Sequence, residues 1–177
     1  KLVAEKGAVS VAPYWDLRFQ PERGVPEAEW ARRTREVLQD AVQKHLLSDV
    51  PLGVLLSGGI DSSTIVALMS QASGERIRTF SIGFSGPGAS GGAYDELAYA
   101  RLVARRFNTE HHEMTVEPRA ADILPRVVWH FDEPFANETA IPMYYVCQMA
   151  RQHVTVALGG VGGDEAFGGY PRYVAAK

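Results

Sequence analysis

The chain has 177 residues, a formal net charge of -3, and 46% hydrophobic against 22% charged residues. Such values are typical of a globular domain with its own core, and they exclude a disordered chain. No run of Lys or Arg exceeds two residues and no apolar run is long enough to span a bilayer, so neither nucleic-acid nor membrane binding is expected.

Residues 1–26 contain several prolines and glycines, which interrupt any long periodic element. We interpret this segment as a lead-in or linker, and because the first residue is Lys1 rather than Met we expect a fragment of a longer protein. A helix is expected from Glu27 to just before Pro51, since acidic residues open it and a proline follows it. Its expected apolar stripe consists of Trp30, Thr34, Val37, Leu38, Ala41 and His45.

Strands and helices are expected to alternate over the rest of the chain. The strands are predicted at residues 52–56, 77–83, 110–116 and 154–158. The helices are predicted at residues 64–69, 95–106, 120–130 and 141–152, with a mobile glycine-rich loop at 85–92. This order predicts a doubly wound parallel α/β sheet, which binds ligands beyond the carboxyl ends of its strands at a topological switch point.

A glycine-rich turn follows the first strand, with the sequence Ser-Gly-Gly-Ile-Asp-Ser-Ser at residues 57–63. Free N–H groups at the start of the next helix can bind an anion, and Gly58 and Gly59 let phosphate oxygens approach the backbone. Asp61 would repel that anion unless a divalent cation lay between them, so it predicts magnesium. Three hydroxyl groups can donate hydrogen bonds, those of Ser57, Ser62 and Ser63.

This turn lacks the Gly-Lys-Ser/Thr ending of the common P-loop. It resembles the Ser-Gly-Gly-x-Asp-Ser signature of the ATP pyrophosphatases, which cleave ATP between its α- and β-phosphates and adenylate a substrate. The alternative is an ordinary helix start capped by Ser and Asp. Two glycines, an inner Asp and a preceding buried strand favour the nucleotide site.

A second turn follows the last strand, with six glycines within residues 157–170. Its bare backbone can approach a flat or anionic ligand closely, and Asp164 and Glu165 supply carboxylates beside it. Taken alone, this stretch could also be a loose surface turn.

Six motifs in one order resemble the synthetase domain of the asparagine synthetase family. They lie at residues 48–51, 57–63, 132–135, 140–142, 162–165 and 167–170, and the resemblance covers about residue 12 to the end. Other ATP pyrophosphatases, which make GMP, NAD or thiolated tRNA, share the first turn but not Gly-Gly-Asp-Glu or Asp-Glu-Pro-Phe. The resemblance implies a three-layer fold of the PP-loop, adenine nucleotide alpha hydrolase-like kind.

The resemblance also implies a reaction and a set of site residues. ATP adenylates a carboxylate, aspartate by default, with release of pyrophosphate, and ammonia then displaces AMP to give an amide. The expected catalytic carboxylates are Asp61, Asp164 and Glu165, of which the first two match magnesium ligands. The expected ATP-binding residues are Ser57, Gly58, Gly59, Ser62 and Ser63 on the pyrophosphate, and Leu55, Ile82, Gly159 and Gly160 near the adenosine.

Members of this family carry an N-terminal glutaminase domain and a later segment that supplies a lysine. We therefore expect residues 1–26 to be the linker from a missing glutaminase domain, and residues 27–177 to be the N-terminal portion of the synthetase domain without its C-terminal part. Such a fragment is expected to be inactive alone. The oligomeric state stays open, a homodimer included.

Three positions depart from the family pattern. Val161 replaces a usual carboxylate, Gly159 replaces a frequent Ser, and Asn137-Glu138 replaces an Asp-Ser-Ser-like stretch on the segment expected to face the acceptor. A β-lactam-forming or otherwise specialised amidotransferase therefore stays open, as does a degenerate module that senses ATP or AMP.

Other conspicuous residues receive structural interpretations. His111 and His112 are adjacent on a strand, point to opposite faces and so should not share a metal ion. Cys147, the one cysteine, excludes an internal disulfide, favours the cytoplasm and is expected to be a small buried core residue. The three tryptophans are expected to be packing residues, and the arginine pairs at 32–33 and 105–106 to lie on solvated helix faces.

Overall fold

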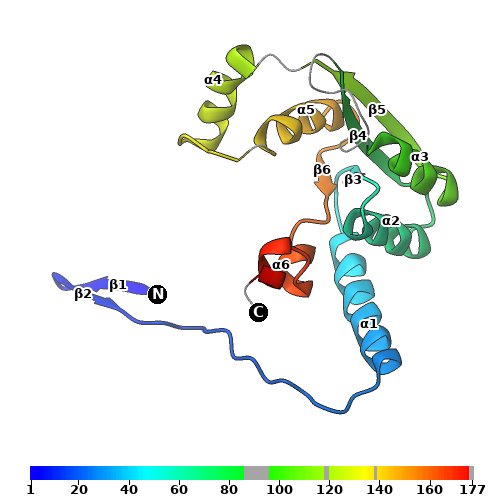
Figure 1. Ribbon diagram of the computed structural model, residues 1–177. Coiled ribbons are helices and arrows are strands. Elements are labelled where there is room, and N and C mark those ends of the chain that lie inside the picture. The colour runs from blue at the N-terminus through cyan, green and yellow to red at the C-terminus, as the bar shows by residue number, and fades with distance from the viewer. Residues whose placement is uncertain (86–95, 118–119, 138, 176–177) are drawn as a thin grey trace. The chain divides into compact units, whose positions relative to one another are not determined.

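The computed structural model describes residues 1–85, 96–117, 120–137 and 139–175 (Figure 1). The loop expected at 85–92 lies almost entirely outside these residues. The chain divides into two compact units, Lys1–Glu36 and Val37–Lys177. In chain order the elements are β1 (Leu2–Glu5), β2 (Ala8–Val11), α1 (Glu27–His45), β3 (Leu52–Leu55), α2 (Ile60–Ala72), β4 (Arg78–Phe84), α3 (Leu97–Arg106), β5 (Glu110–Val116), α4 (Ala120–Phe131), α5 (Ala140–Ala150), β6 (Val156–Leu158), α6 (Gly163–Phe167) and α7 (Pro171–Ala175).

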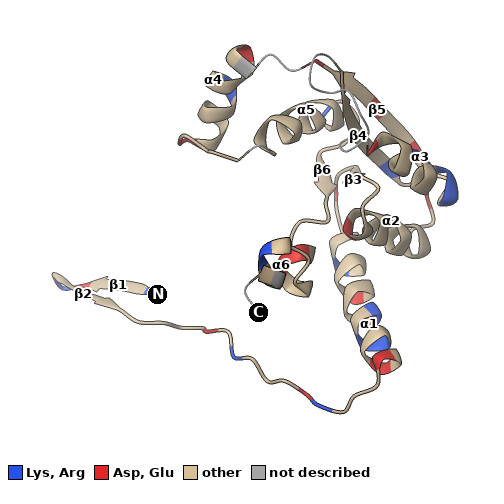
Figure 2. Cartoon of the chain, in the orientation of Figure 1, with Lys and Arg blue, Asp and Glu red and all other residues tan. Residues whose placement is uncertain are grey.

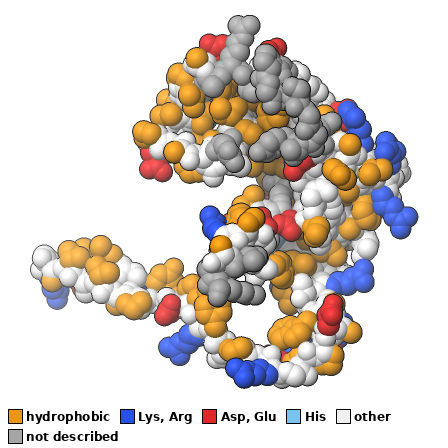
Figure 3. Space-filling view, in the orientation of Figure 1, with side chains coloured by type: hydrophobic (Ala, Val, Ile, Leu, Met, Phe, Trp, Pro, Cys, Tyr) orange, Lys and Arg blue, Asp and Glu red, His pale blue; other side chains and the backbone are white. Residues whose placement is uncertain are grey.

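The smaller unit contains a hairpin that the sequence analysis did not predict. Strands β1 and β2 pair antiparallel, with Leu2 opposite Val11. The two turn residues, Lys6 and Gly7, have φ angles of 50° and 79°, the positive values that a tight two-residue hairpin turn requires. Hydrophobic side chains lie on the surface of this hairpin (Figure 3), and Val11 is 75% exposed.

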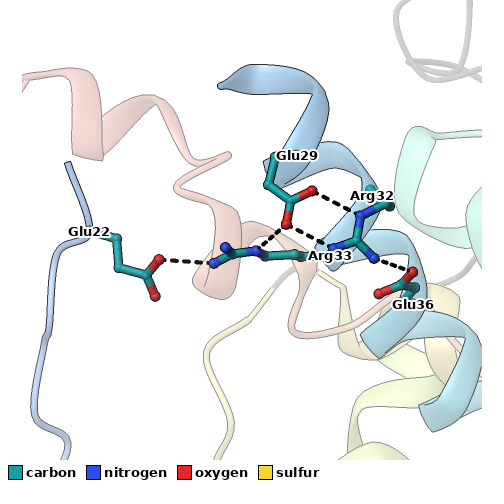
Figure 4. Close-up of polar contacts among 5 residues, drawn as sticks. All are labelled: Glu22, Glu29, Arg32, Arg33 and Glu36. Carbon is teal, nitrogen blue, oxygen red and sulfur yellow. Dashed lines mark hydrogen bonds and ion pairs between the residues drawn. The ribbon is translucent and has the colours of Figure 1, made fainter. Parts of the chain in front are cut away.

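The N-terminal half of α1 carries a network of ion pairs (Figure 4). Arg32 pairs with Glu29 at 2.8 Å and with Glu36 at 2.6 Å, while Arg33 pairs with Glu29 at 2.7 Å and with Glu22 at 2.9 Å. Hydrogen bonds from Arg32 and then Arg33 lower the pKa of Glu29 to about 2. All these groups are in contact with solvent, so the expectation of a solvated arginine pair at 32–33 is confirmed and the net stabilisation is small.

The larger unit is built on a parallel sheet with the strand order β5-β4-β3-β6. From β3 the chain adds β4 and then β5 on one side. It then returns to add β6 on the other side of β3. The direction of winding therefore reverses between β3 and β6, which is the topological switch point of a doubly wound fold.

Helices cover both faces of this sheet, which makes the expected three layers. On one face α1, α2 and α3 pack against Val54 and Leu56 of the β3 segment. On the other face α5 packs against Phe80 of β4, with Leu55 and Ile82 at its margin. Successive residues of β3 thus point to opposite faces and are apolar on both, as expected for a strand buried inside a parallel sheet.

Several packing expectations for single residues are wrong. Val42 is the buried residue of α1 and Leu38 is partly buried beside it, whereas Val37 of the predicted stripe is 68% exposed. The predicted stripe thus included Leu38 but missed Val42, which lies one residue after the predicted Ala41 and about 100° further round the helix. Cys147 is exposed on α5 rather than buried. The tryptophans are also exposed, by 72% at Trp15, 42% at Trp30 and 74% at Trp129.

The described helices include none that is both long enough and apolar enough to cross a membrane.

The first prediction concerns the core of the sheet. Phe80 is completely buried, so Phe80→Ala should lower the free energy of unfolding by about 3–5 kcal/mol through lost burial and a residual cavity. Urea unfolding followed by circular dichroism measures this loss. The same change at Phe19, which is 85% exposed, is the matched control and should cost almost nothing. Equal losses at both positions would contradict this account of the core.

The second prediction concerns the pH dependence of the α1 ion pairs. The pKa of Glu29 is lowered, so its contribution to stability is present above its ordinary value of 4.5 and is lost as the pH falls toward about 2. Removing the Arg32 guanidinium by Arg32→Gln should raise the pKa of Glu29 toward 4.5. A carboxyl-detected NMR titration measures this value, with Lys44→Gln at the other end of α1 as control. An unchanged pKa in Arg32→Gln would rule out the assigned cause.

Candidate nucleotide-binding site

The two predicted glycine-rich turns leave the sheet side by side. Strands β3 and β6 are parallel neighbours, with Val54 opposite Leu158. Ser57 lies three residues beyond Val54, and Gly159 directly follows Leu158. Both turns therefore lie at the carboxyl edge of the sheet, at its switch point, where doubly wound folds bind their ligands.

In the first turn, the backbone demands glycine at one position. Gly58 has a φ of +88°, a left-handed conformation that side chains other than glycine rarely adopt. A Cβ on this residue would also lie 2.5 Å from the backbone nitrogen of Ala100 in α3. The next residue, Gly59, is the N-cap of α2 and provides no side-chain cap. The first N–H groups of α2 are thus left for another partner, as an anion site requires.

The hydroxyl groups of this turn mainly shape the loop. Ser57 and Ser62 form a mutual hydroxyl hydrogen bond of 3.0 Å. The backbone N–H of Ser57 donates to the hydroxyl of Ser62, and that of Gly59 donates to the hydroxyl of Ser57, both at 3.2 Å. Ser63 differs, because its hydroxyl oxygen is buried and has no hydrogen-bond partner among the described residues. The three serines predicted to face a ligand are therefore not equivalent.

Direct contact joins the second turn to the first. A Cβ on Gly160 would lie 2.7 Å from the Cβ of Asp61 and 2.7 Å from the backbone nitrogen of Ser62. A Cβ on Gly163 would lie 2.5 Å from the carboxyl carbon of Asp61. The Asp61 carboxyl group therefore occupies the space that a side chain at 163 would fill. Because Asp164 is the next residue, the two aspartates lie on turns that touch.

These carboxylates suit a particular kind of metal site. Figure 2 shows acidic residues at the start of α2 and in α6, where the first turns contain Asp61 and the pair Asp164 and Glu165. No cluster of three or more His, Cys, Asp or Glu side chains in the described part of the chain is arranged to hold a metal by protein ligands alone. Magnesium commonly takes one or two carboxylates and completes its shell with substrate phosphates and water, so the donor set fits that ion together with a nucleotide.

Glu165 makes a contact of its own within the second turn. The Tyr170 hydroxyl donates to a carboxylate oxygen of Glu165 at 2.7 Å. This hydrogen bond lowers the pKa of Glu165 and raises the pKa of Tyr170. The guanidinium of Arg172 lies 4.1 Å from the centre of the Tyr170 ring, within the range of a cation–π contact. Neither Tyr170 nor Arg172 was assigned a role from the sequence. The run Tyr-Pro-Arg-Tyr after a glycine pair does place an arginine close to two aromatic rings in the sequence.

The residues predicted near the adenosine occupy two different places. Leu55 and Ile82 are partly buried on the α5 face of the sheet, in neighbouring strands. Gly160 lies against Asp61, whereas a Cβ on Gly159 would meet nothing within 4 Å. Val161, which replaces the usual carboxylate, is 87% exposed.

The two histidines of β5 point to opposite faces of the sheet, as predicted. His111 bonds to the Thr79 hydroxyl at 2.9 Å, and desolvation by burial lowers its pKa. His112 points the other way and stacks on His153, with ring centres 3.8 Å apart, and on Phe80. The two rings therefore serve opposite faces of the sheet.

The segment expected to face the acceptor is described only in part. The side-chain oxygen of Asn137 accepts hydrogen bonds from the backbone N–H of Thr139 at 2.9 Å and from its hydroxyl at 2.7 Å. These bonds fix the chain just before α5. Glu138 lies outside the described residues.

Comparison with known proteins assigns this chain to a family. The Asparagine synthase family model matches residues 33–177, so the chain belongs to the asparagine synthase family. It is 39% identical over 168 residues to asparagine synthetase [glutamine-hydrolyzing] 1 of Bacillus subtilis, covering 94% of this chain and 26% of that protein. It is 44% identical over 160 residues to a putative asparagine synthetase [glutamine-hydrolyzing] 2 of Methanocaldococcus jannaschii, covering 89% of this chain and 30% of that protein. The chain thus spans less than a third of either relative.

A solved structure supports the fold assignment. The NH3-dependent NAD synthetase of Campylobacter jejuni matches with a TM-score of 0.50 and 19% identity, covering 78% of this chain and 60% of that chain. At this identity the likeness concerns the fold alone. It agrees with the expected PP-loop type of α/β sheet.

The third prediction tests the contact between the turns. Gly160→Ala should lower the free energy of unfolding by about 1–3 kcal/mol, because the new methyl group would overlap Asp61 and Ser62. Gly159→Ala is the matched control, since the methyl group there meets nothing and should change stability by less than about 1 kcal/mol. Urea unfolding measures both. If the two variants lost the same stability, the turns would not be packed as described.

Proposed function

We propose that this chain forms the ATP-binding part of a synthetase that adenylates a carboxylate and passes it to ammonia. Family membership supports the general chemistry, an ATP-dependent amidation by a carbon–nitrogen ligase. The observation that carries the proposal is the packing of the Asp61 carboxyl group against Gly163, next to Asp164. That contact gives two carboxylates on adjoining turns at the ligand-binding edge of the sheet.

In this proposal ATP spans both turns. Its pyrophosphate lies over the start of α2, where Gly58 and Gly59 carry no side chains and the first N–H groups of the helix have no side-chain cap in the described structure. The nearby hydroxyls belong to Ser57, Ser62 and Ser63. The adenosine lies toward Leu55, Ile82, Gly159 and Gly160. The bare backbone of both turns allows the close approach that a nucleotide needs.

Asp61 and Asp164 are the proposed magnesium ligands, and Glu165 is the third carboxylate of the proposed catalytic group. Magnesium would neutralise charge on the triphosphate as pyrophosphate departs. The protein's own contribution is to hold two oxygen ligands in place and to aim the N–H groups of α2 at the phosphates.

The proposed reaction has two steps. A carboxylate oxygen of the substrate attacks the α-phosphorus of ATP, the bond to the β-phosphate oxygen breaks, and pyrophosphate leaves. Ammonia then attacks the acyl carbon, AMP leaves and an amide remains. A free carboxylate is a poor electrophile, and adenylation supplies the leaving group that it lacks.

The proposal extends to the longer protein. The relatives are named glutamine-hydrolysing synthetases. We therefore propose a glutaminase domain as the source of ammonia, a linker role for residues 1–26, a cytoplasmic setting and aspartate as the default acceptor. A homodimer is compatible with this arrangement.

The valine at position 161 leaves two alternative functions open. Its side chain is 87% exposed in the second turn and can neither accept a proton nor bind ammonium. A specialised amidotransferase or β-lactam-forming enzyme would use an acceptor other than aspartate or a nucleophile other than ammonia. A degenerate module would bind nucleotide without chemistry, although both aspartates that a metal requires are present.

The fourth prediction tests the function directly. The full-length protein should catalyse exchange of radiolabelled pyrophosphate into ATP when aspartate is present, because adenylation is reversible. Asp61→Asn and Asp164→Asn should each lower the affinity for Mg-ATP by roughly tenfold or more, since each removes a charged metal ligand. Asp40→Asn, an exposed carboxylate paired with Lys44 on α1, is the control and should bind Mg-ATP normally.

The outcomes separate the candidates. Exchange with aspartate supports the default, and exchange with another carboxylate alone identifies a specialised relative. Mg-ATP binding without exchange for any carboxylate identifies the nucleotide sensor. Unchanged Mg-ATP affinity in both aspartate variants would refute the proposed metal site.

A further inference from the structure

The turn that contains Asp164 has no apolar anchor in the described structure. Helix α6 spans Gly163–Phe167 and contributes no buried residue, and Phe167 is 63% exposed. A five-residue helix is too short to be stable by itself. Contacts other than apolar burial must therefore fix the direction of the Asp164 carboxylate.

Backbone contacts close part of the turn. Gly162 and Gly168 flank α6 with φ angles of 102° and 68°. The N–H of Gly169 returns to the carbonyl oxygen of Asp164 at 3.0 Å, and a Cβ on Gly169 would overlap the Asp164 carboxyl group. The chain after α6 thus folds back against Asp164 and brings Tyr170 beside it.

One side-chain hydrogen bond then ties this returning segment to α6, and a cation–π contact supports the tyrosine that makes it. The Tyr170 hydroxyl donates to Glu165 at 2.7 Å, and the Arg172 guanidinium lies 4.1 Å above the Tyr170 ring and 5.8 Å from the Tyr173 ring. We call Glu165, Tyr170 and Arg172 the tyrosine clamp. Its hydrogen bond is charge-assisted and therefore among the stronger side-chain contacts of the site.

We infer that Tyr170 is a positioning residue for the metal site: its hydroxyl holds Glu165 and thereby fixes the orientation of the neighbouring Asp164, on the turn that contacts Asp61. This inference rests on the proposed function and assigns a role to a residue that does not itself contact the substrate. Without the hydroxyl, Glu165 loses its hydrogen bond to Tyr170, and no side-chain hydrogen bond among the described residues then holds the returning segment against α6. Asp164 then samples more orientations, and metal binding must supply the ordering.

The fifth prediction measures this effect with Mn²⁺ as the probe. Electron paramagnetic resonance of free Mn²⁺, recorded on the full-length protein with saturating ATP, gives the metal affinity. Tyr170→Phe removes only the hydroxyl and keeps the ring under Arg172, so Mn²⁺ affinity should fall about tenfold. The affinity for metal-free ATP and the midpoint of thermal unfolding should stay close to the wild type, because a purely structural role would change both. Tyr14→Phe, an exposed tyrosine of the smaller unit, is the matched control.

A double-mutant cycle shows whether Tyr170 acts through Glu165. In a Glu165→Ala background, Tyr170→Phe should cause no further loss of Mn²⁺ affinity. An equal loss with and without Glu165 would overturn the inference, as would an unchanged affinity in Tyr170→Phe alone. If Asp164→Asn also left Mn²⁺ affinity unchanged, the proposed metal site itself would fail. A loss in Asp164→Asn with none in Tyr170→Phe would refute the clamp only.

Discussion

The site depends on the close approach of the Asp61 carboxyl group to Gly163, a residue with no side chain to block it. One methyl group at 163, or at 160, would separate the two turns. The glycines of the second turn therefore do more than permit unusual backbone angles. Two of them leave the space in which a carboxylate from the first turn fits, and so bring residues about a hundred positions apart in the chain into contact.

That contact rests in turn on the strand order. Because β6 pairs with β3, the turn after β6 must emerge beside the turn after β3. The apolar runs and the residues that end them predict the strands, and parallel strands end at one edge, so both turns could be assigned to that edge from the sequence. Periodicity alone does not give the pairing of β6 with β3, because it carries no information about which strands are neighbours. The family resemblance implied only that Asp61 and Asp164 both bind magnesium, and therefore that the two turns lie close together.

The predictions that failed share a physical cause. Cys147 was expected to be buried, and Trp15 and Trp129 to be packing residues, because of their residue types. Exposure depends instead on whether another element covers that position. The predicted apolar stripe of α1 contained Leu38 but omitted Val42, because apolar side chains lie on more than one side of this helix and only packing in the core selects Val42. The hairpin of residues 2–11 escaped prediction because its turn is Lys-Gly rather than the commoner Asn-Gly or Asp-Gly.

The two halves of the site differ in what holds them. Asp61 stands on a helix whose first turn includes the buried Ser62 and which continues into the core through Val66, completely buried. Asp164 lies on a short helix with no buried residue, which is held by backbone hydrogen bonds and by exposed polar side-chain contacts. Segments with little apolar burial open at low free-energy cost, whereas core segments open only with global unfolding. A site built this way has one carboxylate fixed by the core and one that polar contacts can adjust. In the proposed site, the second turn can therefore move at a lower free-energy cost than the first, because its movement does not disturb the sheet.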